Sequence, residues 1–314
     1  MRKRDEFLLK RKIRCIFAML FKTQIKKMQQ FKRYSLNING RPVEITRPWV
    51  MGIVNVTDDS FYASSRCIDE QAIARRVSAM VQEGADVIDI GAYSTRPGAA
   101  EVPVEVELKR IEQCMSVVKR IAPDVLTSVD TFRSQVAAHC VETLGVDMVN
   151  DVSGGTLDSE MYRTIARLRV PYVLMHMRGN PATMQQLTDY DDVTAEVLES
   201  LARKIDTLHQ MGIADVIADP GFGFSKTLEQ NFEMLAQLNA FTALNVPLLV
   251  GVSRKSMIYK ALDTTPDEAL NGTTVLHTIA LLHGAHILRV HDVKAAAQAV
   301  KLVTMTYPEM YKTD

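Results

Sequence analysis

The chain has 314 residues, 47% hydrophobic and 24% charged, which is the composition of an ordinary globular protein with a full-sized core. The formal net charge is zero, but residues 1–33 hold 12 Lys/Arg against only Asp5 and Glu6. Residues 34–314 therefore carry 25 basic against 35 acidic side chains, and this net charge of −10 argues against general nucleic-acid affinity.

Cysteine usage and hydropathy indicate a cytoplasmic protein. Cys15, Cys67, Cys114 and Cys140 show neither a CxxC pair nor the spacing of a zinc site, so they are expected to be reduced and mostly buried. No apolar run approaches the roughly 18 residues that a membrane span needs, so no membrane partner is expected.

The first 33 residues form a basic N-terminal extension that is predicted to be disordered. Its apolar run at 13–21 resembles a signal peptide, but Arg14 interrupts the run and no small-residue cleavage site follows. Two alternatives remain: an amphipathic basic helix at a membrane surface, or an unordered extension with Met28 as the functional start. The second is favoured.

Residues 34–47 predict a short β-hairpin, because the Asn39-Gly40 pair lies between two alternating runs. A regular series of short apolar runs follows. Most are separated by segments with helical spacing; Ile73, Val77, Met80 and Val81, for example, share one helix face. The runs are Trp49–Val54, Val87–Ile90, Val125–Val129, Met148–Val149, Tyr172–Met175, Val216–Ala218, Pro247–Val250 and Ile287–Val290.

Eight strands alternating with helices predict an α/β fold with parallel strands joined by crossovers. Residues 49–306 span 258 positions, close to the ~250 of a (β/α)8 TIM barrel. A doubly wound open sheet is the alternative, and the absence of GxGxxG after the first strand weakens it. Since no linker divides it, 34–314 is predicted to be a single barrel domain.

Polar side chains follow nearly every predicted strand. A single residue of this kind can have a purely structural role, because Asp and Asn often begin turns. A whole set in register predicts one pocket at the carboxyl ends of the strands. The set is Asn55, Asp89, Asp130, Asn150, His176, Asp219, Ser253 with Lys255, and Arg289 with His291.

The chemistry of this pocket suits a transferase. Its carboxylates and amides can hold a flat heterocycle by paired hydrogen bonds. Arg289 and His291, with Asn55, suit a phosphate or a divalent ion with phosphates. The segment 254–256, at an expected helix start, offers N–H groups to a second, carboxylate-bearing substrate. No GxSxG, Cys–His or HExxH signature of covalent or zinc catalysis occurs.

Eight motifs in order give the chain a resemblance to the dihydropteroate synthase family of pterin-binding barrels, over about residues 49–303. They are NVTDDSF (55–61), STRPGA (94–99), SVDT (128–131), NDVSGG (150–155), LMHMRGNPATMQ (174–185), DPGFGFSK (219–226), GVSRKSMI (251–258) and RVHDV (289–293). The resemblance implies a homodimeric enzyme of folate biosynthesis that joins (7,8-dihydropterin-6-yl)methyl diphosphate to p-aminobenzoate and releases pyrophosphate. It also implies Mg²⁺ as cofactor and sulfonamides as competitive inhibitors.

The same resemblance assigns roles to residues. The pterin would be bound by Asp130, Asn150, Met175, Asp219, Lys255 and Arg289. The diphosphate would be bound by Asn55, Arg96, Arg289 and His291, with Asn55 as the metal ligand. The p-aminobenzoate side would comprise Phe61, Thr95, Pro97, Phe224, Ser253 and Ser256. Catalysis would depend on Asp89, Asp130, Thr95, Lys255 and Arg289.

The chain departs from the family pattern at Asp58, where Pro is common, and at Ala92-Tyr93, where the family often has Gly-Gly-Glu before STRP. The segments 56–66 and 92–102 are expected to close over the diphosphate. Two other functions stay open: a methyltetrahydrofolate–corrinoid methyltransferase and a catalytically inactive pterin-binding module.

Overall fold

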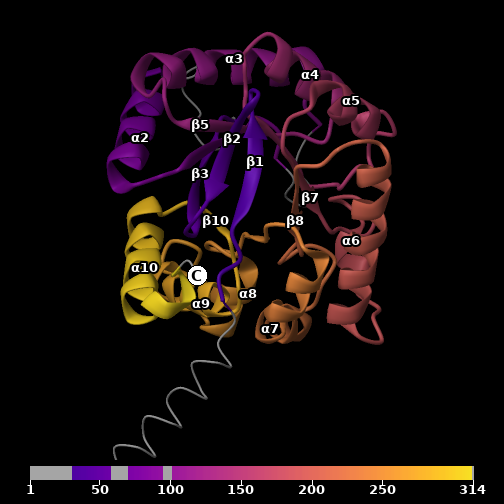
Figure 1. The fold of residues 1–314 in the computed structure, drawn as a ribbon, viewed down its shortest axis with the longest axis vertical. Coiled ribbons are helices and arrows are strands. Elements are labelled where there is room, and N and C mark those ends of the chain that lie inside the picture. Colours follow the sequence, from indigo (N-terminus) through magenta and orange to yellow (C-terminus); the bar gives the residue numbers. More distant parts are fainter. Residues whose placement is uncertain (1–29, 58–69, 95–100, 313–314) are drawn as a thin grey trace, which may run out of the picture.

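The fold is a ring of helices around eight parallel strands, as a computed structural model describes it for residues 30–57, 70–94 and 101–312 (Figure 1). The strands are ordered β8-β7-β6-β5-β4-β3-β10-β9. The ends of this sheet meet, because Ala218 and Leu248 form a parallel bridge and the Ala218 amide donates to the Pro247 carbonyl at 2.9 Å. The predicted (β/α)8 barrel is confirmed, and the doubly wound alternative is excluded.

All eight predicted apolar runs form strands. They are β3 (Trp49–Asn55), β4 (Val87–Gly91), β5 (Leu126–Asp130), β6 (Met148–Asp151), β7 (Tyr172–Met175), β8 (Val216–Asp219), β9 (Leu249–Val250) and β10 (Ile287–Val290). The predicted hairpin is also present, as β1 (Tyr34–Ile38) and β2 (Arg41–Ile45), with Asn39 and Gly40 at positive φ in its turn.

The helices between and after the strands are α2 (Glu70–Glu83), α3 (Val104–Ile121), α4 (Ser134–Glu142), α5 (Met161–Leu168), α6 (Val193–Gln210), α7 (Leu228–Ala236), α8 (Ser256–Ala261), α9 (Leu270–Leu282) and α10 (Val293–Thr306). Short 3-10 turns lie at Met184–Gln186, Leu238–Leu244 and Pro308–Met310. None of the described helices combines the length and the apolar run that crossing a membrane would take.

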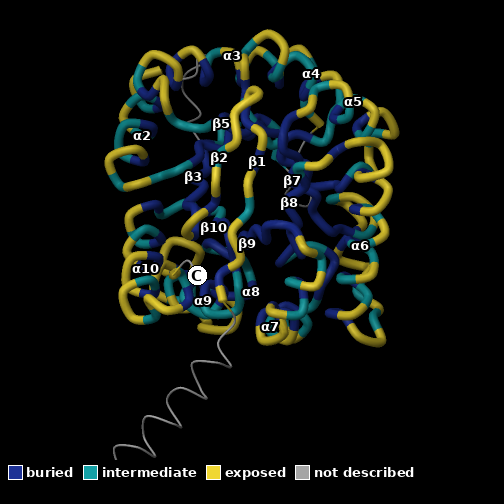
Figure 2. Tube along the Cα trace, in the orientation of Figure 1, coloured by how far each residue is buried: buried dark blue, intermediate teal, exposed yellow. Residues whose placement is uncertain are grey.

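The main core lies between the strands and the inward faces of the helices (Figure 2). In α2 the side chains of Ile73, Val77 and Met80 are fully buried there, as their spacing predicts. Val81, expected on the same face, is instead 38% exposed, because it lies at the border of the apolar stripe. The strands themselves are buried on both sides, as the near-continuous apolar runs require.

The β1–β2 hairpin closes the amino end of the barrel. Its Leu36, Ile38 and Ile45 pack in one cluster with side chains that begin the strands, among them Met51 and Met148. Figure 1 shows the hairpin crossing in front of the strands. The barrel is therefore sealed at the end where the parallel strands start.

A short local pattern recurs before several strands. Gly84, Gly145, Gly212 and Gly284 all have positive φ, and each is followed within two or three residues by a polar side chain at the start of a strand. Asp86 accepts from the Val50 amide (2.8 Å), Asp147 from the Thr127 amide (2.8 Å), and His286 Nδ1 from the Leu248 amide (3.1 Å). Three of these four side chains thus bind an amide in, or directly before, the neighbouring strand.

The same polar residues bind the hairpin and the chain before it. Arg47 donates to Asp86, Asn39 to Asp147 at 2.7 Å, and the Asn37 amide to Asp215 at 3.3 Å. His286 Nε2 lies 3.0 Å from the Lys32 carbonyl oxygen. The closure of the amino end is therefore polar at its rim and apolar at its centre.

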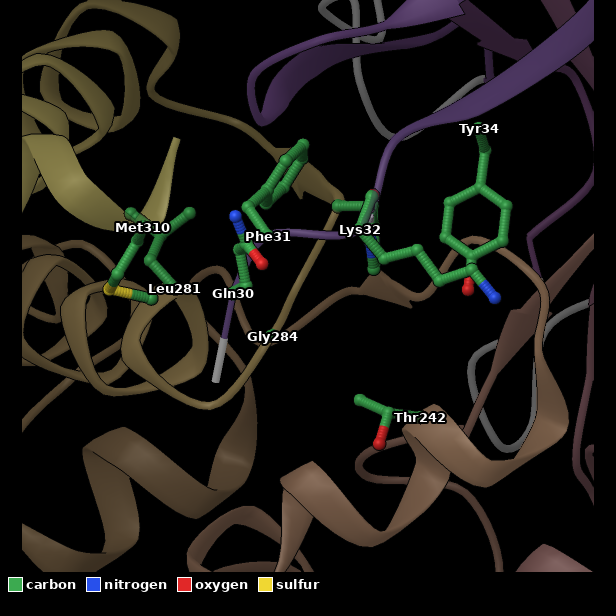
Figure 3. A pocket seen from close by; sticks show the side chains of 9 residues that line it. Gln30, Phe31, Lys32, Tyr34, Thr242, Leu281, Gly284 and Met310 are labelled. Carbon is green, nitrogen blue, oxygen red and sulfur yellow. Dashed lines mark hydrogen bonds between the residues drawn. The ribbon is translucent and has the colours of Figure 1, made fainter. Parts of the chain in front are cut away.

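Residues 30–33, which the sequence assigns to the extension, pack on the barrel in the structure. The Phe31 amide donates to the Met310 carbonyl at 2.8 Å, and its ring lies 4.8 Å from that of His286 and 5.0 Å from that of Tyr311, centre to centre. A small cavity lies beside this contact, between Tyr34, Thr242 and Met310 (Figure 3). The packed part of the chain thus includes Phe31.

Candidate active site

Strand register brings the predicted polar residues together at the carboxyl end of the barrel. Asn55 of β3 pairs with Gly91 of β4, Gly91 with Asp130 of β5, and Asp130 with Asn150 of β6. Because Gly91 has no side chain, Asn55 and Asp130 face a shared space. A Cβ placed on Gly91 would lie 3.3 Å from Asn55 Oδ1 and 3.6 Å from Asp130 Oδ2.

Arg289, at the end of β10, joins two of the predicted carboxylates. Its Nε donates to Asp89 Oδ2 at 2.6 Å and its Nη2 to Asp130 Oδ2 at 2.5 Å. Asn150 Nδ2 also donates to Asp89 Oδ2, at 3.1 Å. Asp89 is fully buried, so the guanidinium supplies the countercharge that a buried carboxylate requires.

Burial and charge set the protonation of this cluster. Burial would lower the pKa of Arg289, but the charges of Asp89 and Asp130 more than offset it, so the guanidinium stays charged. Burial raises the pKa of Asp130 to about 7, even though Arg289 opposes the rise. Asp130 can therefore gain or lose a proton near neutrality.

Asp219 and Lys255 lie on the opposite side of the strand ring. Asp219, which pairs with Met175 in register, accepts from the Gly221 amide at 2.8 Å. Lys255 donates to the Phe222 carbonyl at 2.6 Å, and its ammonium lies 4.7 Å from the centre of the Phe224 ring. Burial lowers the pKa of Lys255 to about 8, with Asp219 opposing the shift, so this lysine is mostly charged at pH 7.

Ser253 and His291 form a further pair beside Arg289. The His291 amide donates to Ser253 Oγ at 3.1 Å, and His291 Nδ1 lies 3.2 Å from the same oxygen. Burial and the charge of Arg289 lower the pKa of His291 to about 4, so its imidazole is neutral at pH 7. A neutral imidazole can donate a hydrogen bond to an anion without adding charge.

Met175 closes the floor of the site next to Asp219. It is 2% exposed and packs in a small apolar cluster with Val152, Met177, Met184 and the ring of Phe224. A thioether and an aromatic ring in this position provide apolar surface for the face of a flat ligand.

The sequence predicts that the segment 254–256 offers N–H groups to a carboxylate-bearing substrate. Two of these groups are already bonded: the Arg254 amide donates to Thr273 Oγ1 at 3.0 Å and the Lys255 amide to the Val252 carbonyl at 3.1 Å. The helix α8 does begin at Ser256, but Arg254 has φ +53 and its guanidinium binds Asp292 at 2.7 and 2.9 Å. It also donates to the Pro266 and Asp267 carbonyls, so the adjacent loops use its donors.

Several predicted site residues lie outside the described residues: Phe61, Thr95, Arg96 and Pro97, as does Asp58. Tyr93 is described, and its contacts explain the bulky side chain at this position. Its ring meets that of Phe132 edge to face at 5.0 Å, and the Arg133 guanidinium lies 5.0 Å from its centre. Arg133 in turn binds the buried Glu107 at 2.7 Å.

Sequence reasoning missed two contributors. One is Lys226, which is 4% exposed and contacts His176. Its signal was in the motif DPGFGFSK, whose last residue is a lysine after a glycine-rich turn. The Phe222 carbonyl, which holds Lys255, is a backbone group and leaves no mark in the residue types.

Comparisons with known proteins agree with this geometry. The sequence profile of the pterin binding enzyme family matches residues 51–291. A dihydropteroate synthase of Escherichia coli strain K12 is 42% identical over 275 residues, which cover 85% of this chain and 94% of that protein.

Solved structures give the same result. The Xanthomonas albilineans dihydropteroate synthase with 4-aminobenzoic acid is 38% identical, with TM-score 0.78 over 88% of this chain and 98% of that one. A second structure of that enzyme, in complex with 7,8-dihydropteroate, is 36% identical, with TM-score 0.75 over 87% of this chain and 98% of that one. The Yersinia pestis enzyme with a sulfonamide drug complex is 37% identical, with TM-score 0.79 over 88% of this chain and all of that one. The chain belongs to the pterin-binding enzyme family and, within it, to the dihydropteroate synthases.

Proposed function

We propose that the site joins (7,8-dihydropterin-6-yl)methyl diphosphate to p-aminobenzoate by means of the cluster around Arg289. The observation that carries this proposal is one guanidinium bound to both Asp89 and Asp130 at the carboxyl end of a parallel barrel. The two carboxylates hold the guanidinium in place, so that it can face negative charge on a substrate without reorganising.

The pterin would lie among Asp130, Asn150, Asp219 and Lys255. Asp130 and Asp219 would accept hydrogen bonds from ring and amino N–H groups, while Lys255 and Asn150 would donate to ring acceptors. Met175 would contact one face of the ring and Arg289 the other, because an arginine plane stacks well on a flat heterocycle. Burial raises the pKa values of Asp130 and Asp219. This fits carboxylates whose hydrogen bonds are made to a bound ligand and not to water.

The diphosphate would lie between Asn55, His291 and Arg289, with Arg96 as a further ligand from outside the described residues. Mg²⁺ fits here as well. The oxygens of Asn55 and Asp130 converge on the space at Gly91, and Mg²⁺ binds through one or two protein oxygens together with substrate phosphates. Asn55 is the proposed metal ligand. When bound, the ion would neutralise charge on the departing diphosphate.

p-Aminobenzoate would bind beside Ser253, Ser256 and Phe224, with Phe61, Thr95 and Pro97 completing its site from outside the described residues. In the reaction, the bond between the methylene carbon and the diphosphate oxygen breaks and its electron pair leaves with pyrophosphate. The aniline nitrogen then forms the C–N bond with its lone pair and loses a proton to solvent. Asp130 stabilises positive charge on the pterin while the bond breaks.

Three further properties complete the proposal. Sulfonamides would compete for the p-aminobenzoate site, as the drug complex of the Yersinia pestis relative suggests. A homodimer would form through the outer faces of α9 and α10, where Val275, Leu302 and Met305 are 50%, 64% and 68% exposed. A cytoplasmic location is supported by the buried thiols Cys114 and Cys140, whose pKa values burial raises to about 12.

The test is a coupled assay of pyrophosphate release that requires both substrates. Wild-type protein should turn over, while Asp130→Ala and Lys255→Ala should lose about 100-fold or more in kcat/KM. Lys109→Ala, on the exposed face of α3, is the matched control and should behave as wild type. Unchanged rates in both pocket variants would refute the assignment; wild-type binding of pterin without turnover would favour the inactive module.

A further inference from the structure

Lys226 is a buried lysine that the reaction above does not use. It follows the turn after β8, and its ammonium lies under that turn. Nζ donates to the Gly221 carbonyl at 3.0 Å and to the Phe224 carbonyl at 3.0 Å, and it lies 3.2 Å from His176 Nδ1. Burial lowers the pKa of Lys226 to about 7, with the charge of Asp219 opposing the shift. In its charged form the ammonium has three hydrogens, and these three acceptors use all of them.

His176 is suited to be the third acceptor. It is 4% exposed, and burial together with the charge of Lys226 lowers its pKa to about 2. The imidazole is therefore neutral at any working pH, and its Nδ1 can accept from the lysine. The His176 amide also donates to the Asp219 carbonyl at 2.9 Å, so the residue connects the ends of β7 and β8.

The turn that Lys226 holds carries groups of the pterin site. Its Phe222 carbonyl binds Lys255, its Phe224 ring lies beside the Lys255 ammonium, and its Gly221 amide binds Asp219. The turn fits tightly, because a Cβ on Gly221 would lie 2.0 Å from the His176 carbonyl oxygen. A shift of this turn would therefore move Lys255 and Phe224 together.

We propose that Lys226, held by His176, is a positioning residue for pterin binding, and that it acts through residues 221–225. This inference rests on the proposed function. The lysine also acts through charge: burial raises the pKa of Asp219, and the positive charges of Lys255, Arg289 and Lys226 oppose that rise. Loss of the Lys226 charge would therefore disfavour the carboxylate form of Asp219 that accepts from the ligand.

The experiment compares four variants for affinity, kinetics and stability. Lys226→Met keeps the volume and removes the charge and donors, and His176→Leu removes the acceptor. His176→Asn keeps an acceptor close to the position of Nδ1. His286→Leu is the matched control, because His286 is an equally buried histidine at the amino end of the barrel. Binding of the dihydropterin diphosphate is measured by calorimetry, kcat and both KM values by pyrophosphate release, and stability by urea unfolding.

Lys226→Met and His176→Leu should weaken pterin binding by about 10- to 100-fold, since the loss of a hydrogen bond to a charged group of the pterin site has effects of that size. KM for p-aminobenzoate should change less, and His176→Asn should restore affinity to within about threefold of wild type. His286→Leu should lose stability while its affinity for the pterin stays that of the wild type.

The inference fails if Lys226→Met or His176→Leu loses stability but binds the pterin as wild type does. It also fails if His176→Asn binds as weakly as His176→Leu. Should Lys226→Met not fold, the two His176 variants decide the question. If the wild type binds the pterin without releasing pyrophosphate, the proposed function fails, while the affinities of the variants still test the role of Lys226.

Discussion

The two ends of the barrel use polar residues for opposite purposes, although the same strands supply them. Asp86 directly precedes β4, and Asp89 lies three residues later within that strand. Asp147 and Asn150 have the same relation to β6, and His286 and Arg289 to β10. The first of each pair binds a main-chain amide of the neighbouring strand. The second belongs to the site.

At the amino end, the polar side chains make their hydrogen bonds to groups of the protein itself, which stay in place. His286, for example, is engaged at both ring nitrogens, and burial lowers its pKa to about 4, so it is neutral at pH 7. At the carboxyl end, side chains bind one another. No described residue donates to Asp89 Oδ1, which is fully buried.

This difference indicates which end of the barrel can take part in a reaction. A carboxylate bound to main-chain amides uses its hydrogen-bonding capacity within the fold and stabilises it. Carboxylates bound to one shared guanidinium, such as Asp89 and Asp130, can exchange part of that interaction for a substrate. Variants at the amino end should therefore change stability without changing catalysis, whereas variants at the carboxyl end should change catalysis.

The largest effect is expected for Arg289→Met. The change leaves Asp89 buried without its countercharge, so the free energy of unfolding should fall by about 3–5 kcal/mol. Because diphosphate and pterin would both lose a ligand, kcat/KM should fall by about 1,000-fold or more. Urea unfolding and the pyrophosphate assay measure the two quantities.

Arg47→Met is the matched control at the amino end. Arg47 also binds an aspartate, at 2.6 Å from Asp86, but its side chain is 52% exposed. Its loss should cost less than about 1 kcal/mol and leave kcat/KM unchanged. Equal losses of stability in the two variants would contradict the contrast between the ends.

Asp130→Asn should lower kcat/KM by about 100-fold or more without destabilising the protein. Burial raises the pKa of Asp130 to about 7, so the folded protein holds its proton more tightly than the unfolded chain does. The stabilisation from this proton is complete below pH 4 and is lost as the pH rises through 7. The difference in unfolding free energy, wild type minus variant, should therefore fall between pH 4 and 7, and a flat difference would contradict the pKa shift.

The sequence predicts the frame of the site better than its internal contacts. The strands could be predicted because buried parallel strands are short apolar runs, and Asn39-Gly40 marks the hairpin because few other pairs adopt positive φ at both positions. Asp89, Asp130 and Arg289 could be placed in one pocket, since the ends of parallel strands meet.

The contacts that the sequence does not predict depend on backbone direction and on depth. Arg254 lies next to Lys255, but its left-handed backbone turns its side chain to Asp292. From its residue type, Lys226 would be expected at the surface. Its ammonium instead lies under a turn and donates to two carbonyls of that turn in place of water. Neither fact follows from residue type or spacing.

Asp147→Ala, at the amino end, is expected to have an effect of intermediate size on stability. Asp147 accepts from the Thr127 amide and hydroxyl, both at 2.8 Å, and from Asn39 at 2.7 Å. Leaving these donors without an acceptor should lower the free energy of unfolding by about 1–3 kcal/mol. Asn150, three residues later, is held in place by β6 itself, so both KM values should stay as in wild type. A raised KM for the pterin would mean that the two ends of the barrel are coupled.

The smallest effect is expected for Gly212→Ala. Gly212 has φ +83, which an L side chain adopts at a cost of about 1–2 kcal/mol, but no atom lies within 4 Å of the added Cβ. Only this backbone cost should appear in urea unfolding, and kcat/KM should not change. Gly221 has a similar φ of +73 at the other end, yet a Cβ there would strike the His176 carbonyl. Gly221→Ala should therefore impair pterin binding as well as stability, because the turn that must shift also positions Lys255. The turn at Gly212, by contrast, leads into the amino end of β8.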